Sequence, residues 1–424
     1  MTLAQLLQFI LSISILVILH ELGHFIPAKY FKTKVEKFYL FFDPWFSLVK
    51  KKIGETEYGI GWLPFGGYVK IAGMVDESMD TEQLKTPPQP WEFRSKPAWQ
   101  RLIIMLGGVT VNFFLAWFIY SCLSYFKGET YHDNAKFTNG ISVTPEGRKM
   151  GLQTGDKILK IDGKPADRFE TSVVNMLFAD EVQVLRNGRE VTVPINENGV
   201  ADVLKANEAR AYFSSRFPVV VDTILPKGGA AVAGLMKGDR VTAINGKPVR
   251  FFDELTDQLA AQKNKQVSLT VQRGGQTVTK QVNVNAEGRV GFGPDQRIAE
   301  SEFDKSKIRK QYSFLEAIPR GFQRTIDVLV MQIKQFKIVF NSTTQGYKKV
   351  SGPIGIIKQM PETINWEYFW GFTAMFSVWL AFLNLIPIPG LDGGHVMFTL
   401  WEMITGKPVP QKVLENAQMI GVIF

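Results

Sequence analysis

Two histidines and a glutamate near the N-terminus are the residues whose types and spacing most clearly suggest chemistry. They form the pattern H-E-x-x-H within His20-Glu21-Leu22-Gly23-His24. On a helix, a spacing of four residues places both imidazoles on one face, where they can bind one zinc ion, with the glutamate beside them as a general base. The chain has only 4 histidines, so chance rarely produces this pattern. The alternative is a pair of histidines in a structural core.

A zinc site of the catalytic type needs one more ligand, because it usually combines three protein ligands with a water molecule. Residues 384–395 read Asn-Leu-Ile-Pro-Ile-Pro-Gly-Leu-Asp-Gly-Gly-His, so prolines and glycines end an apolar run. Irregular backbone at membrane depth is tolerated only inside protein or beside a cavity. Asp392 and His395 are therefore the candidates for the third ligand, and for His395 a role outside metal coordination is the alternative.

Three apolar runs place these residues in a membrane. The runs cover residues 3–19, 102–126 and 368–388, and the second and third contain no charged residue. A helix needs about 20 such residues to span a bilayer, so a purely soluble enzyme is excluded. The first run lacks the basic start and the cleavage site of a signal peptide, which favours a retained helix. The apolar stretch 417–424 suggests a fourth helix that is cut short.

The distribution of basic residues predicts the orientation in the membrane. They gather after the first run and before the second, at Lys29, Lys32, Lys34, Lys37, Arg94, Lys96 and Arg101. By the positive-inside rule, the N-terminus lies outside and residues 32–100 lie in the cytoplasm. The net charge of +9 fits attraction to anionic lipid, and without a nucleic-acid-binding motif we expect no such partner. The single Cys122 excludes an intramolecular disulfide.

An internal repeat marks the region between the second and third runs. Residues 151–165 return as residues 234–248, and 8 of the 15 positions are identical. Each copy is followed by a predicted hairpin, with an Arg-Asn-Gly turn at Arg186 and an Arg-Gly-Gly turn at Arg273. We therefore expect two tandem copies of a small β-rich domain, on the outer side of the membrane.

Residues 312–340 carry an apolar stripe at helical spacing with basic residues among it. The stripe predicts an amphipathic helix. Such a helix could lie on the outer membrane surface, and an ordinary packed helix is the alternative.

These motifs resemble those of the site-2 protease family of intramembrane zinc proteases. The similarity rests on H-E-L-G-H in the first membrane segment and N-L-I-P-I-P-G-L-D-G-G in a later one. The second segment holds a G-x-x-x-N element at residues 108–112, residues 58–71 look like a membrane-re-entrant β-hairpin, and the repeats resemble PDZ domains. The resemblance covers nearly the whole chain and departs from the family at the incomplete last helix.

The expected fold is a multi-pass α-helical membrane protein of about four transmembrane helices, the last truncated, with a re-entrant β-hairpin and two tandem PDZ-like α+β domains. The expected boundaries run in chain order. They are 1–31 for the first transmembrane helix, 32–100 for the hairpin region, 101–126 for the second helix, 127–210 and 211–300 for the PDZ-like domains, 301–365 for the amphipathic region, 366–400 for the third helix and 401–424 for a loop and the start of the fourth.

The resemblance also implies roles for single residues. His20, His24 and Asp392 would bind Zn²⁺, and Glu21 would activate water and pass its proton to the leaving amine. Asn384 would help to hold substrate, which agrees with its capacity to hydrogen-bond a peptide carbonyl or oxyanion. An interhelical hydrogen bond is the alternative for Asn384, and it is the preferred interpretation for Asn112.

The predicted hairpin suggests how substrate is held. An exposed strand edge could pair with an unwound membrane segment by β-augmentation, and glycines would allow close backbone approach. The candidate contact residues are Gly59, Ile60, Gly61, Gly66, Gly67 and Tyr68. The alternative is a plain cytoplasmic hairpin without a substrate role.

The resemblance implies a protease of regulated intramembrane proteolysis in the envelope stress response, located in the bacterial inner membrane. The active site would face the cytoplasm, and the PDZ-like pair would act in the periplasm as a size filter. The expected substrates are single-span proteins, namely an anti-sigma factor and remnant signal peptides, and we expect a monomer in the lipid bilayer.

Two other functions compete with the protease on sequence alone. A non-catalytic scaffold could use the PDZ-like pair to bind chains, but it would not need Glu21. A metal transporter could use the histidines as a transit site, but conduction usually requires several sites along a path.

Overall fold

Three long apolar helices form the frame around the H-E-x-x-H motif. Among the residues that the computed structural model describes (1–74, 86–206, 212–349, 352–410, 413–414 and 416–417), only α1 (Leu3–Tyr30), α2 (Ala98–Lys127) and α11 (Trp366–Leu385) are long and apolar enough to cross a membrane. They coincide with the three predicted apolar runs, so the prediction of an integral membrane protein is confirmed. Most of the expected fourth helix lies outside the described residues.

The chain divides into two compact units. The first consists of Met1–Gly128, Gln311–Ile333 and the described part of Ser351–Phe424, and the second of Glu129–Lys310 and the described part of Lys334–Val350. The first unit therefore holds all three candidate membrane helices, and the second holds both copies of the repeat.

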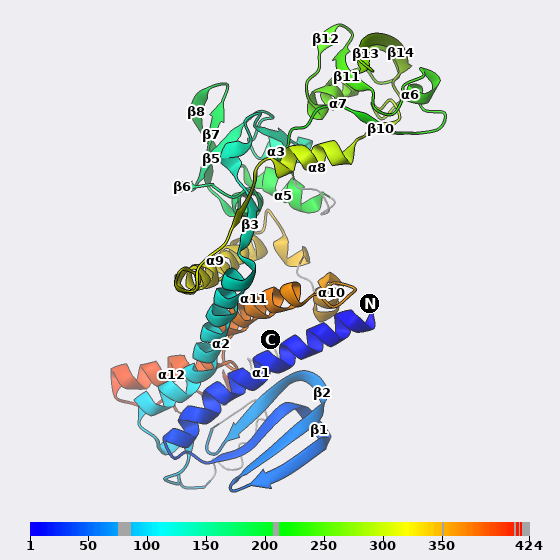
Figure 1. The fold of residues 1–424 in the computed structure, drawn as a ribbon. Coiled ribbons are helices and arrows are strands. Elements are labelled where there is room, and N and C mark those ends of the chain that lie inside the picture. The colour runs from blue at the N-terminus through cyan, green and yellow to red at the C-terminus, as the bar shows by residue number, and fades with distance from the viewer. Residues whose placement is uncertain (75–85, 207–211, 350–351, 411–412, 415, 418–424) are drawn as a thin grey trace. The chain divides into compact units, whose positions relative to one another are not determined.

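Local sequence explains where the membrane helices begin and end. Helix α1 starts at a capping box. The backbone N–H of Gln5 donates to the Thr2 hydroxyl, and the backbone N–H of Thr2 donates to the side-chain oxygen of Gln5. Helix α2 ends at Gly128, whose φ of 69° strongly favours glycine. Helices α1 and α2 pack against each other, and α11 also packs against α2 (Figure 1).

The third membrane helix breaks after Leu385. Pro387 and Pro389 prevent its continuation, Gly390 adopts a φ of 94°, and helix α12 (Asp392–Thr405) then begins at Asp392. The expected span 366–400 is therefore two helices joined by a short irregular segment. Helix α10 (Pro353–Gln359) precedes α11 in the same unit.

Two long strands, β1 (Val35–Ile53) and β2 (Thr56–Ile71), pair in antiparallel fashion and pack against α1. Both strands bend midway, so the first part of β1, residues 35–40, pairs with residues 57–60 on one side and residues 67–71 on the other. Residues 47–53 extend the sheet beyond residues 56–61. The described pairing thus leaves residues 67–71 at one edge and 47–53 at the other.

This sheet corrects the predicted hairpin. The sequence predicts a hairpin within residues 58–71, but these residues belong to a single strand, β2, and both halves of β2 pair with β1, which lies between them. The aromatic and β-branched residues of 35–42, such as Val35, Phe38 and Tyr39, could have indicated this strand. Buried apolar residues including Val35, Ile71 and Ile104 hold the sheet against α1 and α2.

The second unit contains two small domains that repeat one topology, each built on a four-stranded antiparallel sheet. The order is β6-β5-β7-β8 in the first repeat and β12-β11-β13-β14 in the second. The first sheet consists of β5 (Lys157–Ile161), β6 (Lys164–Pro165), β7 (Glu181–Arg186) and β8 (Arg189–Pro194); the second consists of β11 (Arg240–Ile244), β12 (Lys247–Pro248), β13 (Gln266–Arg273) and β14 (Gln276–Asn283).

Each repeat adds a second, two-stranded sheet and short helices around its own apolar core. In the first repeat these elements are β4 (Ile141–Val143), β9 (Phe213–Ser215), α3 (Pro145–Lys149), α4 (Phe169–Asn175) and α5 (Glu197–Lys205); in the second they are β10 (Val221–Ile224), β15 (Phe292–Pro294), α6 (Gly229–Val232) and α7 (Phe252–Ala260). Because β9 pairs with β4 and Phe213 belongs to the first core, the first domain extends beyond the expected boundary at residue 210.

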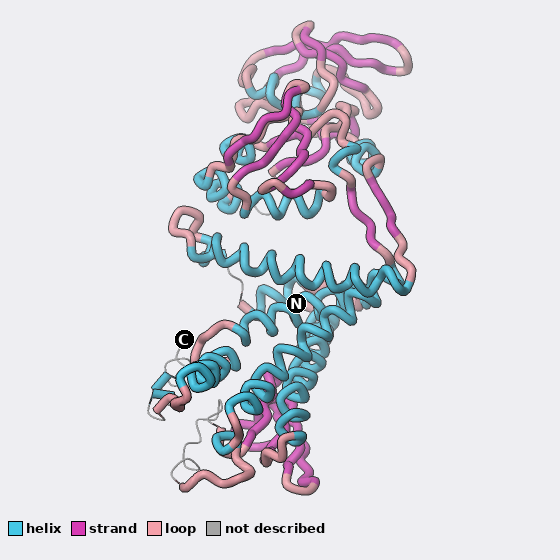
Figure 2. Tube along the Cα trace, turned by 90° about the vertical axis from the view of Figure 1, so that its left-hand side faces the viewer, coloured by secondary structure: helices cyan, strands magenta, loops and turns pink. Residues whose placement is uncertain are grey.

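A two-stranded ribbon completes the second unit. Strands β3 (Glu129–His132) and β16 (Lys307–Lys310) pair along their whole length and are the two adjacent magenta segments at the right of Figure 2. Helix α8 (Gln296–Asp304) precedes β16. Helix α9 (Phe314–Phe340) confirms the predicted helix over 312–340, and the division between the two units falls within it.

Candidate metal centre

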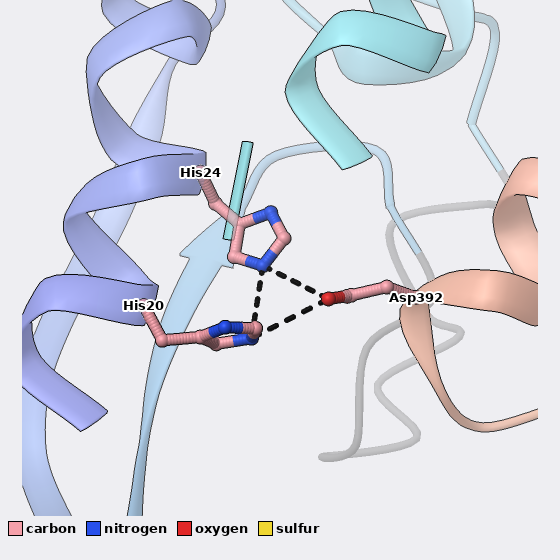
Figure 3. Close-up of side chains that lie close together, drawn as sticks. All are labelled: His20, His24 and Asp392. Atoms are coloured by element: carbon pink, nitrogen blue, oxygen red, sulfur yellow. Dashed lines mark hydrogen bonds and ion pairs between the residues drawn. The ribbon is translucent and has the colours of Figure 1, made fainter. Parts of the chain in front are cut away.

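The two motifs at opposite ends of the chain meet in the first unit. His20 and His24 lie on one face of α1, and Asp392, the first residue of α12, faces both (Figure 3). The Nε2 atoms of the two histidines are 3.3 Å apart, and the Asp392 Oδ2 atom lies 3.4 Å from His20 Nε2 and 3.3 Å from His24 Nε2. The spacing of the motif and the break after α11 together produce a triangle of three donor atoms.

The dimensions of this triangle fit a zinc ion. In a tetrahedral site with zinc–ligand bonds near 2.0–2.1 Å, neighbouring ligand atoms lie about 3.3–3.4 Å apart. The observed edges of 3.3, 3.3 and 3.4 Å match this value. Asp392 Oδ2 is also buried and accepts no hydrogen bond within the described part of the chain. The donor set of two imidazoles and one carboxylate is one that zinc prefers.

Helix α2 supports both histidines from behind. His24 Nδ1 lies 2.8 Å from the carbonyl oxygen of Ile104, and His20 Nδ1 lies 3.0 Å from the amide nitrogen of Asn112. Between them, a Cβ on Gly108 would lie 2.4 Å from His24 Nε2 and 2.5 Å from His20 Cε1. Only a residue without a side chain leaves room for the imidazoles there. Sequence reasoning noted the G-x-x-x-N element but did not foresee this contact.

The break between α11 and α12 brings Asn384 to the same place as Asp392. The Asn384 amide nitrogen lies 3.1 Å from His20 Nε2, on the side of the ring that faces the donor triangle. Gly393 makes the sharp return possible, because a Cβ there would lie 2.2 Å from the Ile386 carbonyl oxygen. The two polar residues of the later motif therefore converge on the N-terminal motif, as the family resemblance implies.

A cavity of about 690 Å³ opens beside the donor triangle. Its walls include Glu21, Asn384 and Asp392, together with residues of the sheet such as Gly67 and Tyr68. His395 also lines the cavity, but the cluster of donor atoms consists of His20, His24 and Asp392. A polypeptide in extended conformation could therefore reach both the carboxylate of Glu21 and the donor triangle.

The edge of the sheet at residues 67–71 forms one wall of the site. The backbone amide of Val69 hydrogen-bonds the carboxylate of Glu21. A Cβ on Gly67 would lie 2.6 Å from a methyl carbon of Val17, so the glycine lets the strand approach α1. The other predicted contact residues Gly59, Ile60, Gly61 and Gly66 do not line the cavity.

Gly59 and Gly61 instead accommodate the sheet itself. A Cβ on Gly59 would lie 2.3 Å from the ring of Tyr39, and one on Gly61 would lie 2.1 Å from the Phe42 carbonyl oxygen. These two glycines are thus needed by contacts between β1 and β2.

Tyr68 is part of the cavity wall and carries a neutral hydroxyl. Its hydroxyl donates to Asp43 Oδ1 over 2.9 Å, and the Ser47 hydroxyl donates to the other oxygen of Asp43 over 3.0 Å. Burial raises the pKa of Tyr68, and the hydrogen bond to the Asp43 carboxylate raises this pKa further. The side chain therefore stays protonated across the physiological range and fixes the bend of β1 beside the cavity.

Comparison with known proteins agrees with this site. The chain matches the model of peptidase family M50 over residues 8–424. A protein of Neisseria meningitidis named as a zinc metalloprotease, NMA0084, is 30% identical over 443 residues, which cover 99% of this chain and 94% of that protein. The regulator of sigma-E protease RseP of Escherichia coli is 27% identical, over 99% of this chain and 95% of its own length. The regulator of sigma E protease of Haemophilus influenzae is also 27% identical, over 98% of this chain and 94% of its own length.

Proposed function

Because the chain belongs to peptidase family M50, the site-2 protease family, and is a zinc metalloprotease, we propose that it is an intramembrane endopeptidase. Its substrates are single-span membrane proteins, whose transmembrane segments it hydrolyses. The observation that carries this proposal is the donor triangle of zinc dimensions next to Glu21, held between helices that can cross a membrane. A transporter or a scaffold would not require the carboxylate at this place.

In this proposal His20, His24 and Asp392 hold the zinc ion. When bound, zinc polarises the scissile carbonyl and lowers the pKa of water, which makes water a competent nucleophile at neutral pH. The chain supplies the rest of the chemistry. Glu21 lies one residue after the first ligand, so its carboxylate can take the proton of the attacking water and deliver it to the leaving amine.

Two further groups position the peptide. The Asn384 amide nitrogen lies 3.1 Å from His20 Nε2 and can donate to the oxyanion that forms at the scissile carbonyl. The strand edge at residues 67–71 can pair with a substrate segment that has unwound from its helix. Such pairing provides partners for backbone groups that the substrate helix had satisfied internally.

The two repeats act in this proposal as PDZ-like modules in the periplasm, where they admit substrates whose outer domain is already short. Their tandem sheets and separate cores suit independent binding modules. The protease works as a monomer in the bacterial inner membrane, with its active site toward the cytoplasm. The names of the two regulators of sigma-E support an anti-sigma factor as substrate in the envelope stress response, and remnant signal peptides are a second substrate class.

A Glu21→Gln variant tests the proposed reaction. Purified full-length wild type and variant are incubated in detergent with a tagged single-span substrate, and zinc content is measured on the same samples. The variant should keep its zinc and lose at least about 10²-fold in cleavage rate, the usual scale for removal of a general base.

A substrate without a membrane span is the control for this experiment. A substrate that carries the same tags but lacks the membrane span should remain intact, because the proposal places cleavage within the span. Equal cleavage by wild type and variant, or cleavage of the spanless substrate alone, would overturn the proposal. Loss of zinc from the variant would contradict the role assigned to Glu21, since that role does not include metal binding.

A further inference from the structure

The two histidines of the donor triangle each have a second ring nitrogen, and both of these nitrogens face α2. Ile104, Gly108 and Asn112 are spaced four residues apart and therefore lie on one face of that helix. Because α1 and α2 run in opposite directions, Ile104 meets His24 and Asn112 meets His20. Ile104 and Asn112 are both fully buried.

The partner of His24 defines the protonation of its ring. A carbonyl oxygen only accepts hydrogen bonds, so the 2.8 Å contact between Ile104 and His24 requires a proton on Nδ1. A neutral imidazole with a proton on Nδ1 has its lone pair on Nε2, the atom in the donor triangle. The backbone of α2 thus prepares His24 for a metal.

His20 needs the same tautomer, because its Nε2 atom also belongs to the triangle and must keep its lone pair for the metal. If Nε2 binds the metal, the proton of His20 resides on Nδ1 and needs an acceptor. The amide of Asn112 lies there, with its nitrogen 3.0 Å from Nδ1, while its oxygen is buried without a hydrogen-bond partner among the described residues. A half-turn of the amide exchanges oxygen and nitrogen and places the oxygen opposite Nδ1.

We infer that Asn112 is a positioning residue of the metal centre: its amide oxygen accepts a hydrogen bond from Nδ1–H of His20 and keeps Nε2 unprotonated and aimed at the metal. The inference rests on the ligand set proposed above. It assigns to a side chain of α2 the task that a backbone carbonyl performs for His24. Partners of this kind fix the tautomer and orientation of a metal-binding histidine, and their loss typically lowers metal affinity about 10- to 100-fold.

Substitutions that differ in hydrogen-bonding capacity test this role. Asn112→Asp keeps an acceptor and removes the donor, whereas Asn112→Leu keeps the branched shape of the side chain and has neither. Full-length protein is stripped of metal, and Zn²⁺ affinity is measured by competition with a chromophoric chelator, with Co²⁺ absorption as a second readout of ligand geometry. We expect Asn112→Leu to lose about 10- to 100-fold in affinity and Asn112→Asp to stay within a few-fold of wild type.

Ser377→Ala is the matched control for a merely structural effect. The Ser377 hydroxyl donates to the backbone carbonyl of Asn112 over 2.8 Å, and Ser377 is as buried as Asn112. Its removal therefore disturbs the packing around Asn112 without removing the side chain that faces His20. This variant should bind zinc like wild type. If Asn112→Leu fails to fold, Asn112→Ala takes its place in every comparison, because it removes both hydrogen-bonding groups without adding volume.

Three outcomes would overturn the inference: unchanged affinity in Asn112→Leu, an equal loss in Ser377→Ala, or a loss in Asn112→Asp as large as in Asn112→Leu. The last outcome would mean that the asparagine donates rather than accepts. His20→Ala separates this inference from the proposed ligand set. If His20→Ala binds zinc like wild type, the ligand set itself is wrong, whatever the Asn112 variants show.

Discussion

The carbonyl oxygen of Gly23 faces the Cα atom of Gly107 across the contact between α1 and α2, and a Cβ on Gly107 would lie 1.9 Å from that oxygen. Pro27 cannot donate to this oxygen, because proline lacks the N–H that would bond the carbonyl four residues earlier. A weak Cα–H···O contact can satisfy it in part. Since His24 follows Gly23 directly, this close approach determines how near α2 comes to the imidazoles.

A Gly107→Ala substitution should therefore weaken zinc binding, although Gly107 does not contact the metal ligands. The new methyl group meets backbone, which cannot move aside as a flexible side chain would, so we expect a loss of about 1–3 kcal/mol in stability together with weaker zinc binding. Thermal unfolding in detergent and chelator competition measure the two effects. Gly371→Ala is the control, because no atom lies within 4 Å of its Cβ position. Wild-type behaviour of Gly107→Ala would contradict the close helix contact.

Asp392 and His395 should behave differently when each is replaced by alanine. Sequence alone left both as candidates for the third ligand, but only the Asp392 carboxylate joins the two histidines. Asp392→Ala should lose more zinc affinity than the roughly 10- to 100-fold typical of an outer partner, whereas His395→Ala should keep its zinc. Metal content after dialysis against a weak chelator distinguishes them. Retention by Asp392→Ala with loss in His395→Ala would exchange the two roles.

The membrane helices and the placement of His20 beside His24 could be predicted from sequence because both depend on strong local signals, whereas the choice of Asp392 as the third ligand rested on the family resemblance. Uncharged runs identify spanning helices, and the four-residue spacing fixes the relative placement of His20 and His24 whatever surrounds them. The part played by α2 could not be predicted in this way. The Ile104 contact involves a backbone carbonyl, to which any residue type could contribute, and Gly108 acts through the absence of a side chain.

The sheet was harder to predict because its strands are long and bent. Residues 57–63 and 64–71 each carry the alternation of a strand, and Pro64 with the following glycines resembles a turn between them. In the structure the chain continues through this segment as one strand, and residues 35–40 supply the partner on both sides. Local alternation indicates strands but leaves their pairing undetermined, which here depends on packing against α1.

The repeats contain a matched ion pair that the sequence did not reveal as such. Arg186 binds both carboxylate oxygens of Asp156, and Arg273 binds both of Asp239, with distances of 2.7–2.8 Å. In each repeat the arginine comes from the predicted turn. The Asp239 side chain has 0% exposure, so the pair joins the start of one strand to the following hairpin inside the domain.

Asp239→Asn should loosen the second repeat, because it leaves Arg273 beside a neutral amide. We expect hydrogen exchange of the β13 amides in the full-length protein to accelerate roughly tenfold or more. Asp222→Asn is the control, since its partner Lys237 is 67% exposed and exposed pairs contribute little. Equal exchange rates in the two variants would show that the buried Asp239–Arg273 pair stabilises the domain no more than the exposed pair does.

The same pair predicts how stability depends on pH. Burial would raise the pKa of Asp239, but hydrogen bonds from Arg273 and the Met236 amide outweigh it and hold this pKa below its usual value. Such a carboxylate stabilises the fold fully above its unfolded pKa of about 3.9 and progressively less as the pH falls through the folded pKa. The difference in melting temperature between wild type and Asp239→Asn should therefore shrink below about pH 4. A difference that grows on acidification would refute this assignment.

Gly67→Val should separate substrate positioning from metal binding. Its Cβ would lie 2.6 Å from Val17 and 2.7 Å from the Tyr39 carbonyl oxygen, so the strand edge must move away from α1 while the donor triangle on α1 and α12 stays in place. A shift of about 1 Å in a positioning element can cost about 10²-fold in rate, and we expect a loss of that order in cleavage of the single-span substrate with zinc content unchanged. Ile53→Ala, at the opposite edge of the sheet where the side chain is exposed, is the control and should cleave like wild type.

If Gly67→Val loses zinc together with activity, the edge supports the metal centre and not the substrate. If it cleaves at the wild-type rate, the substrate strand does not pair at this edge.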